Sequence, residues 1–261
     1  MTPHAALERG LGELTLPLPE STRQRLLQYV ALLAKWNRTY NLTAVRTQEE
    51  MVSLHLLDSL AILPHLPVPQ GDPALADAGS GAGLPGIPLA LARPQWRVTL
   101  VESSAKKAAF LRQATIELGM GNVAVQEARV EQWHPGRRFA VVVSRAFAGL
   151  AQFIAACRHL VAPYGVLAAM KGRDPSAELA GLPPGCGCVE PLATVDKGPQ
   201  KGGQGSGVSE GTSLQLELVR LRAPVLARSK AVRATTSRVG VCHDSIVPLG
   251  NPVVRPLRMQ R

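Results

Sequence analysis

The stretch from Leu75 to Ala92, LADAGSGAGLPGIPLALA, decides the fold of this chain. It begins with a short apolar run that contains an acid, Asp77, and continues with glycines at alternate positions, Gly79, Gly81 and Gly83. A second apolar segment follows, with prolines near its start, where the missing N–H of proline costs a helix nothing. Glycine adopts positive φ angles freely and lets a ligand approach the backbone. This order predicts a strand, a tight ligand-binding turn and a helix.

The glycine spacing separates several classes of nucleotide site. The dinucleotide pattern G-x-G-x-x-G/A has a small residue at its sixth position, where this chain has Leu84, and no G-x-x-x-x-G-K-[ST] sequence is present. The spacing acid-x-G-x-G-x-G resembles the first motif of class I S-adenosylmethionine-dependent methyltransferases. The next predicted strand, residues 97–101, is followed by Glu102, and an acid at this distance can bind both ribose hydroxyls. S-adenosylmethionine is therefore the expected cofactor, held by Asp77, the three glycines and Glu102.

Strands and helices alternate through the middle of the chain. Helices are expected near residues 85–92, 104–118 and 149–160, with a short turn near 128–133, and strands at 74–78, 97–101, 122–126, 139–143 and 165–170. Such alternation predicts an α/β fold with a parallel, doubly wound, Rossmann-like sheet. Ligands bind such sheets beyond the carboxyl ends of the strands. Because Asp77, Glu102, Arg145 and Lys171 all lie at strand ends, we expect them on one rim.

Composition and charge indicate the class of protein and partner. The 261 residues suggest one large domain, or one domain with attachments. The net charge is +10, and residues 224–261 carry seven Lys or Arg against one Asp. This balance suits RNA, although an Arg-rich surface that only confers solubility gives the same charge. The four cysteines lack the paired spacing of a zinc site, and no apolar run of about 20 residues or signal-peptide core is found. We expect a cytoplasmic protein without metal.

Helical segments are expected before the first strand. Residues 1–18 show only a weak helical pattern. A capping box at Ser21–Gln24 predicts a helix from about Thr22 to Asn37, and a second one at Thr47–Glu50 predicts a helix that ends at Pro64. Residues 1–70 therefore form a helical flank. Within it, His55 and Asp58 are more readily interpreted as a buried polar pair than as ligands, and Asn41 and Thr43 as turn formers.

The pattern weakens after Lys171. Residues 71–223 are predicted to form the catalytic domain, with an insert at about 181–213 whose nine Gly and four Pro indicate a flexible loop. Alternating Leu residues between Thr212 and Leu221 predict one further strand. Residues 224–261 have no clear period and are expected to form a poorly ordered basic tail.

Four sequence blocks resemble the bacterial 16S rRNA guanine-N7 methyltransferase family called RsmG or GidB. The blocks are Trp36–Val45, His55–Leu60, Asp77–Pro88 and Val143–Phe147, and the segment Ser103–Lys107 with Arg112 and Lys171–Gly172 also matches. Many methyltransferases share the glycine motif, whereas the two N-terminal blocks and Ser-Arg-Ala-Phe are more specific. The C-terminal end departs from the family pattern, because the glycine-rich insert and basic tail replace a short loop and an Arg-containing strand.

The resemblance implies methyl transfer to N7 of a guanine in the 530 loop of 16S rRNA, guanine 527 in that family. It implies 16S rRNA or the 30S subunit as the partner, and we expect a monomer. It places Gly79 and Leu84 at the cofactor, Val130 and Glu131 beside the adenine, and Arg145 at the cofactor and substrate pocket. Four basic residues are candidate phosphate contacts or part of a solvated face: Lys106, Lys107, Arg112 and Lys171.

Methylation at N7 needs no general base, because this nitrogen carries a free lone pair. Catalysis can then consist of positioning and electrostatics. Arg145 is the candidate catalytic residue, since a guanidinium can stack on a base or bond a phosphate and the guanine O6 edge. An ion pair between Arg145 and a rim acid is the competing interpretation.

Two other functions stay open at the level of the sequence. A non-enzymatic RNA-binding protein on the same scaffold would explain the altered C-terminal end and the basic tail. A nicotinamide-dependent reductase is more remote, because Leu84 replaces the third glycine of the dinucleotide pattern and no Tyr-x-x-x-Lys sequence is evident.

Overall fold

The structure is a computed structural model, and the part of the chain that it describes belongs to one compact unit, Met1–Val225. Residues 1–67, 73–145, 147, 149–171 and 176–182 are described in full, and residues 189–195 and 216–222 as backbone only. The expected basic tail, residues 224–261, lies outside the described residues.

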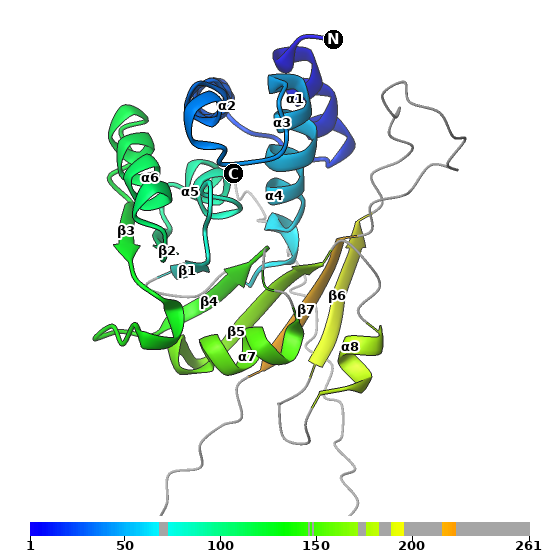
Figure 1. Ribbon diagram of the computed structural model, residues 1–261. Helices are drawn as coiled ribbons and strands as arrows, with labels where there is room; N and C mark the ends of the chain where they lie inside the picture. Colours follow the sequence, from blue (N-terminus) through cyan, green and yellow to red (C-terminus); the bar gives the residue numbers. More distant parts are fainter. Residues whose placement is uncertain are drawn as a thin grey trace, which may run out of the picture. The chain divides into compact units, whose positions relative to one another are not determined.

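The described strands form one sheet in the order β3-β2-β1-β4-β5-β7-β6 (Figure 1). Strands β1 to β5 are parallel, and β7 pairs antiparallel with both β5 and β6. Their bounds are β1 Ala74–Ala78, β2 Arg97–Glu102, β3 Val123–Glu127, β4 Phe139–Ser144, β5 Val161–Lys171, β6 Val189–Val195 and β7 Leu216–Arg222. The parallel part confirms the predicted doubly wound fold, and the five predicted strands are found within a few residues of their expected bounds.

Helices cover both faces of the sheet, and the side chains of the central strands alternate accordingly. Leu75, Leu100 and Val143 join the core that contains α5 (Gly86–Ala92), α6 (Ala105–Glu117) and the N-terminal helices. Ala76, Val101 and Val142 join the core beneath α7 (Leu150–Cys157), on the opposite face (Figure 1). Every residue of β1 is buried, as expected for a central parallel strand.

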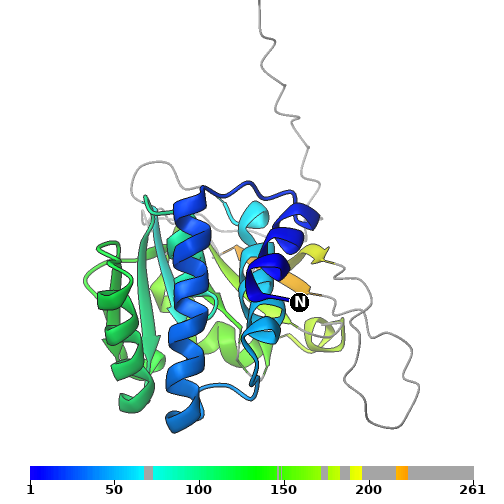
Figure 2. The same ribbon diagram turned by 90° about the horizontal axis from the view of Figure 1, so that it is seen from above.

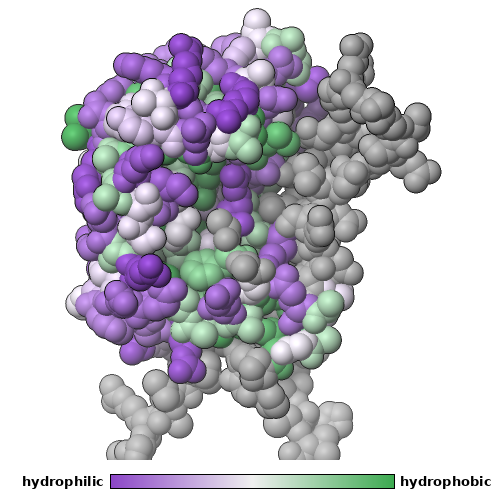
Figure 3. Space-filling view, in the orientation of Figure 1, coloured by the Kyte–Doolittle hydropathy of each residue, from purple (hydrophilic) through white to green (hydrophobic). Residues whose placement is uncertain are grey.

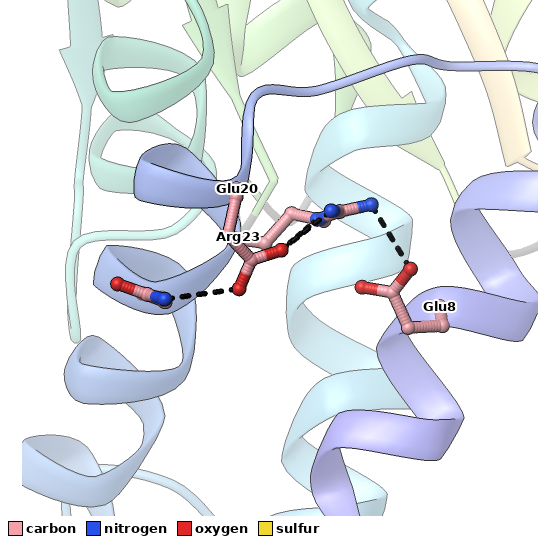
Figure 4. Close-up of polar contacts among 4 residues, drawn as sticks. Glu8, Glu20 and Arg23 are labelled. Atoms are coloured by element: carbon pink, nitrogen blue, oxygen red, sulfur yellow. Dashed lines mark hydrogen bonds and ion pairs between the residues drawn. The ribbon is translucent and has the colours of Figure 1, made fainter.

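The N-terminal flank packs over α5 and α6. It consists of α1 (Pro3–Glu13), α2 (Glu20–Tyr40), α3 (Gln48–Met51), a π-helical turn η1 (Val52–Leu57), α4 (Asp58–Ala61) and a 3₁₀ turn η2 (Leu63–His65). Figure 2 shows α2 as a long helix beside α6. At the start of α2, the Arg23 guanidinium bonds Glu20 on its own helix and Glu8 of α1, at 3.0 Å from the Glu8 Oε2 (Figure 4). This contact joins α1 to α2.

The two predicted capping boxes have different outcomes. Thr47 and Glu50 cap each other's backbone N–H groups at the start of α3, which confirms the second box. The first box, at Ser21–Gln24, is wrong, because α2 begins earlier and has Pro19 as its N-cap. The Pro19 carbonyl already accepts hydrogen bonds from the N–H groups of Thr22 and Arg23. Ser21 therefore lies inside the first turn, where its side chain is not needed as a cap.

The region after β5 contains more regular structure than predicted. A short helix, α8 (Ser176–Ala180), follows β5, and β6 lies inside residues 181–213, which were expected to form a flexible loop. Glycine and proline counts averaged over the insert conceal the β-forming run from Val189 to Val195. The predicted strand at residues 212–221 is found as β7, which pairs with β5 from Glu217 to Arg222 and with β6 on its other side.

Candidate functional site

The turn after β1 has the geometry of a ligand-binding loop. Gly79, Gly81 and Gly83 have φ angles of +70°, +58° and +91°, which only glycine adopts without strain. The N–H groups of Gly79 and Ser80 both donate to the Val101 carbonyl, at 2.9 and 3.0 Å. Among the described residues, a Cβ at position 79 would meet only the edge of the Phe147 ring at 4.0 Å, which leaves open space in front of Gly79. At position 83 it would lie 2.4 Å from Ile87, so Gly83 serves packing instead.

Asp77 holds the turn from behind. Its side chain is fully buried, and its Oδ2 accepts a 2.8 Å hydrogen bond from the N–H of Gly86, at the start of α5. Its Oδ1 is also buried and has no hydrogen-bond partner among the described residues. Burial raises the pKa of Asp77 to about 7, and the bond from Gly86 opposes this rise only in part. The side chain thus shapes the loop rather than the surface of the pocket.

Glu102 connects the glycine turn to the beginning of α6. Its Oε2 accepts a hydrogen bond from the N–H of Gly81 at 2.8 Å, and its Oε1 accepts one from the N–H of Ser104 at 2.8 Å. The carboxylate is nearly buried, with 7% of the residue exposed. Each carboxylate oxygen retains lone-pair capacity for another donor. Glu102 can therefore hold the loop and receive a hydroxyl at the same time.

A pocket of about 130 Å³ opens beside the glycine turn. Its walls come from the turn after β1, the end of β2 and the residue after it, the 3₁₀ turn η3 (Val130–Gln132) with the residues before it, and the segment after β4. The lining residues are Gly79, Val101, Ser103, Ala128, Arg129, Val130, Glu131 and Phe147. In the orientation of Figure 1, Figure 3 shows hydrophobic residues in the middle of the drawn face and hydrophilic residues over α6 and the N-terminal helices. Of the predicted cofactor residues, Gly79, Val130 and Glu131 line the pocket, whereas Leu84 is buried in the core beneath α5 and α6.

Arg145 lies at the end of β4 and contacts the N-terminal flank. Its Nη1 donates to the Leu54 carbonyl at 3.3 Å, and its Nη2 lies 3.3 Å from the Nδ1 of His55. The Nε2 of His55 lies 2.8 Å from the Thr43 hydroxyl. Burial and the Arg145 charge lower the pKa of His55. His55 is buried, and its described contacts are with Thr43, the Leu54 carbonyl and Arg145, so its pairing with Asp58 stays a prediction.

Two buried polar residues that hold loops near the site were not predicted. Tyr29 of α2 is fully buried, and its hydroxyl donates to the Ala82 carbonyl inside the glycine turn at 2.6 Å. Burial raises the pKa of Tyr29, so the phenol stays protonated as a donor. Asn37 organises the loop after α2, because its side chain bonds the N–H of Thr43 and the carbonyl of Val45. A polar residue on the apolar stripe of a predicted helix is the only signal that the sequence offers for either.

The candidate RNA-binding residues have different surroundings. Lys106 is exposed, and its ammonium lies 5.7 Å from the centre of the Tyr40 ring. Arg112 pairs with Glu127 at 2.9 Å on the surface, and Lys171 pairs with Glu178 at 2.9 Å. Glu178 also accepts a hydrogen bond from the N–H of Leu150, at the start of α7. Lys171 therefore has a structural partner, and the structure does not bring it together with Lys106 in a described contact.

Neither a metal centre nor a membrane span is found in the part of the chain that the structure describes. No group of three or more His, Cys, Asp or Glu residues there could hold a metal ion. No helix there is long and apolar enough to cross a membrane.

Comparisons with known proteins show the family of the chain. The model of the family described as "rRNA small subunit methyltransferase G" matches residues 22–189, more than half of the chain. The chain is 54% identical to ribosomal RNA small subunit methyltransferase G of Nitrosospira multiformis over 190 residues, covering 70% of this chain and 86% of that protein. It is 49% identical to the protein of the same name from Chromobacterium violaceum, covering 76% and 94%.

Among solved structures, precorrin-6y C5,15-methyltransferase from Geobacter metallireducens is similar over 63% of this chain and 87% of that chain, with 18% identity and a TM-score of 0.47. The residues matched by the family, 22–189, include the glycine turn, Arg145 and the part of the N-terminal flank that contacts Arg145. The chain therefore belongs to the rRNA small subunit methyltransferase G family.

Proposed function

We propose that this protein methylates N7 of a guanine in the 530 loop of 16S rRNA, at guanine 527. Its family membership makes it an rRNA methyltransferase, with S-adenosylmethionine as the methyl donor. The assignment to guanine N7 in the 530 loop is supported by the resemblance of the sequence blocks around Asn41, His55 and Arg145. We infer that the partner is 16S rRNA, either free or within the 30S subunit. We also infer that the enzyme is a monomer in the cytoplasm.

The observation that carries this proposal is the glycine turn, fixed by Glu102 on one side and Asp77 on the other, with open space in front of Gly79. This geometry fits S-adenosylmethionine, because a ribose needs hydroxyl acceptors and an adenine needs a pocket. We assign Gly79, Gly81 and Glu102 to the ribose and methionine part, and Val130 and Glu131 to the adenine. Asp77, Gly83 and Leu84 support the turn from its core side, through a hydrogen bond and through packing. The bound cofactor supplies an electrophilic methyl group on a sulfonium.

Besides binding the cofactor, the protein has to orient the guanine. Attack by N7 uses its own lone pair, so no proton has to leave at that step. Asp77 is buried behind the turn and is unsuited to be a base. Arg145 ends the neighbouring strand on the same rim, and its guanidinium can bond the O6 edge of the base or a flanking phosphate. Lys106 and Lys107, on the first turn of α6, are the proposed contacts to the RNA backbone.

The test is methyl transfer from labelled S-adenosylmethionine to 30S subunits that lack the modification in the 530 loop. We expect label on the N7 of one guanine in that loop, a loss of cofactor binding in Glu102→Ala, and a loss of transfer with cofactor binding retained in Arg145→Ala. Arg9→Ala is the matched control, because Arg9 is exposed on α1 and pairs with Glu13 of its own helix.

Two results would contradict the proposal. Label at another position or on another RNA would leave the methyltransferase assignment in place and reject the guanine-N7 target. RNA binding without any transfer, although the cofactor binds, would favour the alternative of a non-enzymatic RNA-binding protein.

A further inference from the structure

The hydrogen bonds around His55 form a connected path from the loop after α2 to Arg145. The hydroxyl of Thr43 accepts a hydrogen bond from the N–H of Val45 at 3.2 Å and lies 2.8 Å from the His55 Nε2. The Nδ1 of His55 lies 2.9 Å from the carbonyl of Leu54. The same carbonyl accepts a hydrogen bond from Arg145.

These distances assign the tautomer of His55. A carbonyl oxygen can only accept, so its 2.9 Å contact requires a proton on Nδ1. Nε2 is then the acceptor, and the hydroxyl of Thr43 donates to it. The other tautomer would let Nδ1 accept from Arg145 at 3.3 Å, but it would leave the Nδ1 lone pair facing the closer carbonyl. With the proton on Nδ1, the contact between Nδ1 and the Arg145 Nη2 is not a hydrogen bond, and His55 and Arg145 are joined through the Leu54 carbonyl to which both donate.

The Leu54 carbonyl lies within the π-helical turn η1, between α3 and α4. Turns of this kind alter the regular hydrogen-bond ladder and are frequent at functional sites. Here the turn presents one carbonyl to two side-chain donors, one from its own element and one from the end of β4. Arg145 is therefore held by the N-terminal flank, and the flank is held in turn by the loop that contains Thr43.

We propose that His55 is a positioning residue for Arg145, and that the Thr43 hydroxyl keeps His55 in the tautomer that this role requires. The inference rests on the proposed function of Arg145 in methyl transfer. Protonation of His55 would remove the acceptor of the Thr43 hydroxyl and place a second positive charge 3.3 Å from the guanidinium. The charged groups that act on His55 are Arg145, which opposes its protonation, and Asp58, which favours it.

The proposal predicts a specific pH dependence. The pKa of His55 is lowered from its ordinary value of 6.5, so His55 is neutral at pH 7 and the path is intact. The rate of methyl transfer should fall only when the pH drops below the lowered pKa of His55, as the imidazole gains its second proton. Removing the Thr43 hydroxyl takes away a bond to the neutral form, which raises the pKa of His55 and moves the acid limb to higher pH.

Two variants test this at the same position. Thr43→Val replaces the hydroxyl by a methyl group of similar shape, and Thr43→Ser retains it. We expect Thr43→Val to lower kcat about 3- to 10-fold with an unchanged KM for S-adenosylmethionine, and to shift the acid limb upward by roughly half a pH unit. Thr43→Ser should resemble the wild type. Thr115→Val, on α6, controls for the loss of a threonine hydroxyl that bonds only its own helix.

An NMR titration of histidine-labelled protein gives a readout independent of activity. We expect the Nδ1–H tautomer for His55, a pKa below 6.5, and a higher pKa in Thr43→Val. An Nε2–H tautomer, or an acid limb that stays in place in Thr43→Val while kcat changes, would overturn the inference. If the wild type fails to methylate 30S subunits, the proposed function fails, and the titration together with the Arg145 Nε–H resonance still decides whether His55 fixes Arg145.

Discussion

Glu102 satisfies two backbone N–H groups with one carboxylate, on Gly81 and Ser104. Glu102→Gln replaces one of these acceptors by an amide NH₂ that cannot accept, so one N–H is left without its partner. We expect the affinity for S-adenosylmethionine to fall about 10- to 100-fold, in proportion to the removal of one charge-assisted hydrogen bond at the turn. Calorimetry measures this directly. Glu127→Gln is the control, because Glu127 pairs with Arg112 on the surface, and an equal decrease in both variants would contradict the role of Glu102.

Asp77 links the stability of the turn to pH. Its pKa rises from 3.8 to about 7 on folding because the carboxyl is buried, so the folded state binds this proton more tightly than the unfolded state. The stabilising contribution of the protonated form is present below about pH 4 and is lost as the pH rises through 7. In Asp77→Asn this dependence should vanish.

The measurement for Asp77 is urea unfolding of the wild type and Asp77→Asn at about pH 5 and about pH 8. The variant should gain stability relative to the wild type between these two values, by about 1–4 kcal/mol. A difference between the two proteins that does not depend on pH would mean that the carboxyl of Asp77 titrates normally in the folded state.

At the scale of elements, the close approach of α5 to β1 depends on Gly86. A Cβ at this position would lie 2.3 Å from the Leu100 side chain and 2.7 Å from the Asp77 Oδ2. Gly86→Ala should therefore destabilise the fold by about 1–3 kcal/mol or more and weaken cofactor binding, since the start of α5 must move. Gly136→Ala is the matched control, because a Cβ there would meet nothing within 4 Å. Equal denaturation midpoints for the two variants would show that α5 can shift without cost.

The elements that the sequence predicts well are those whose signal is local. The strands β1 to β5 are apolar runs bounded by turns, and the Thr47 box places both capping partners within four residues. The rim follows from topology, because parallel strands bring Glu102 and Arg145 to the same edge as the glycine turn. The π-helical turn η1 was not predicted, since an apolar helical period continues through it and its packing against α1 and α2 leaves no local signal in the sequence.

Long-range polar contacts are the part of the site that pattern reasoning misses. Tyr29 is 53 positions from the Ala82 carbonyl that it bonds, and Leu54 is 91 positions from Arg145. In the sequence, Tyr29 and Leu54 occupy ordinary positions on apolar helical segments. Their roles follow only when the flank is packed over α5, which is why the N-terminal blocks could be identified by resemblance and not by their chemistry. The same reasoning explains Lys171, whose partner Glu178 lies on an unpredicted helix.

At the scale of the whole molecule, more than half of the net positive charge lies outside the segment that contains the candidate site. The glycine turn, Glu102 and Arg145 all belong to the unit Met1–Val225, whereas residues 224–261 carry a net charge of +6. A protein that ends at Ala223 should therefore bind S-adenosylmethionine with unchanged affinity. Its affinity for 30S subunits should fall, most strongly at low salt, because basic residues that neutralise phosphates release counterions.

The salt dependence of 30S binding tells whether residues 224–261 contact RNA. If the seven basic residues of 224–261 neutralise phosphates, the slope of log affinity against log salt becomes shallower on truncation, by roughly 0.7–0.9 for each phosphate that is no longer neutralised. Lys106→Ala in the full-length chain gives the comparison, since it should affect at most one phosphate beside the rim. An unchanged slope after truncation, with cofactor affinity retained, would assign RNA binding to the compact unit alone and leave Lys106, Lys107 and Arg145 as its principal charges.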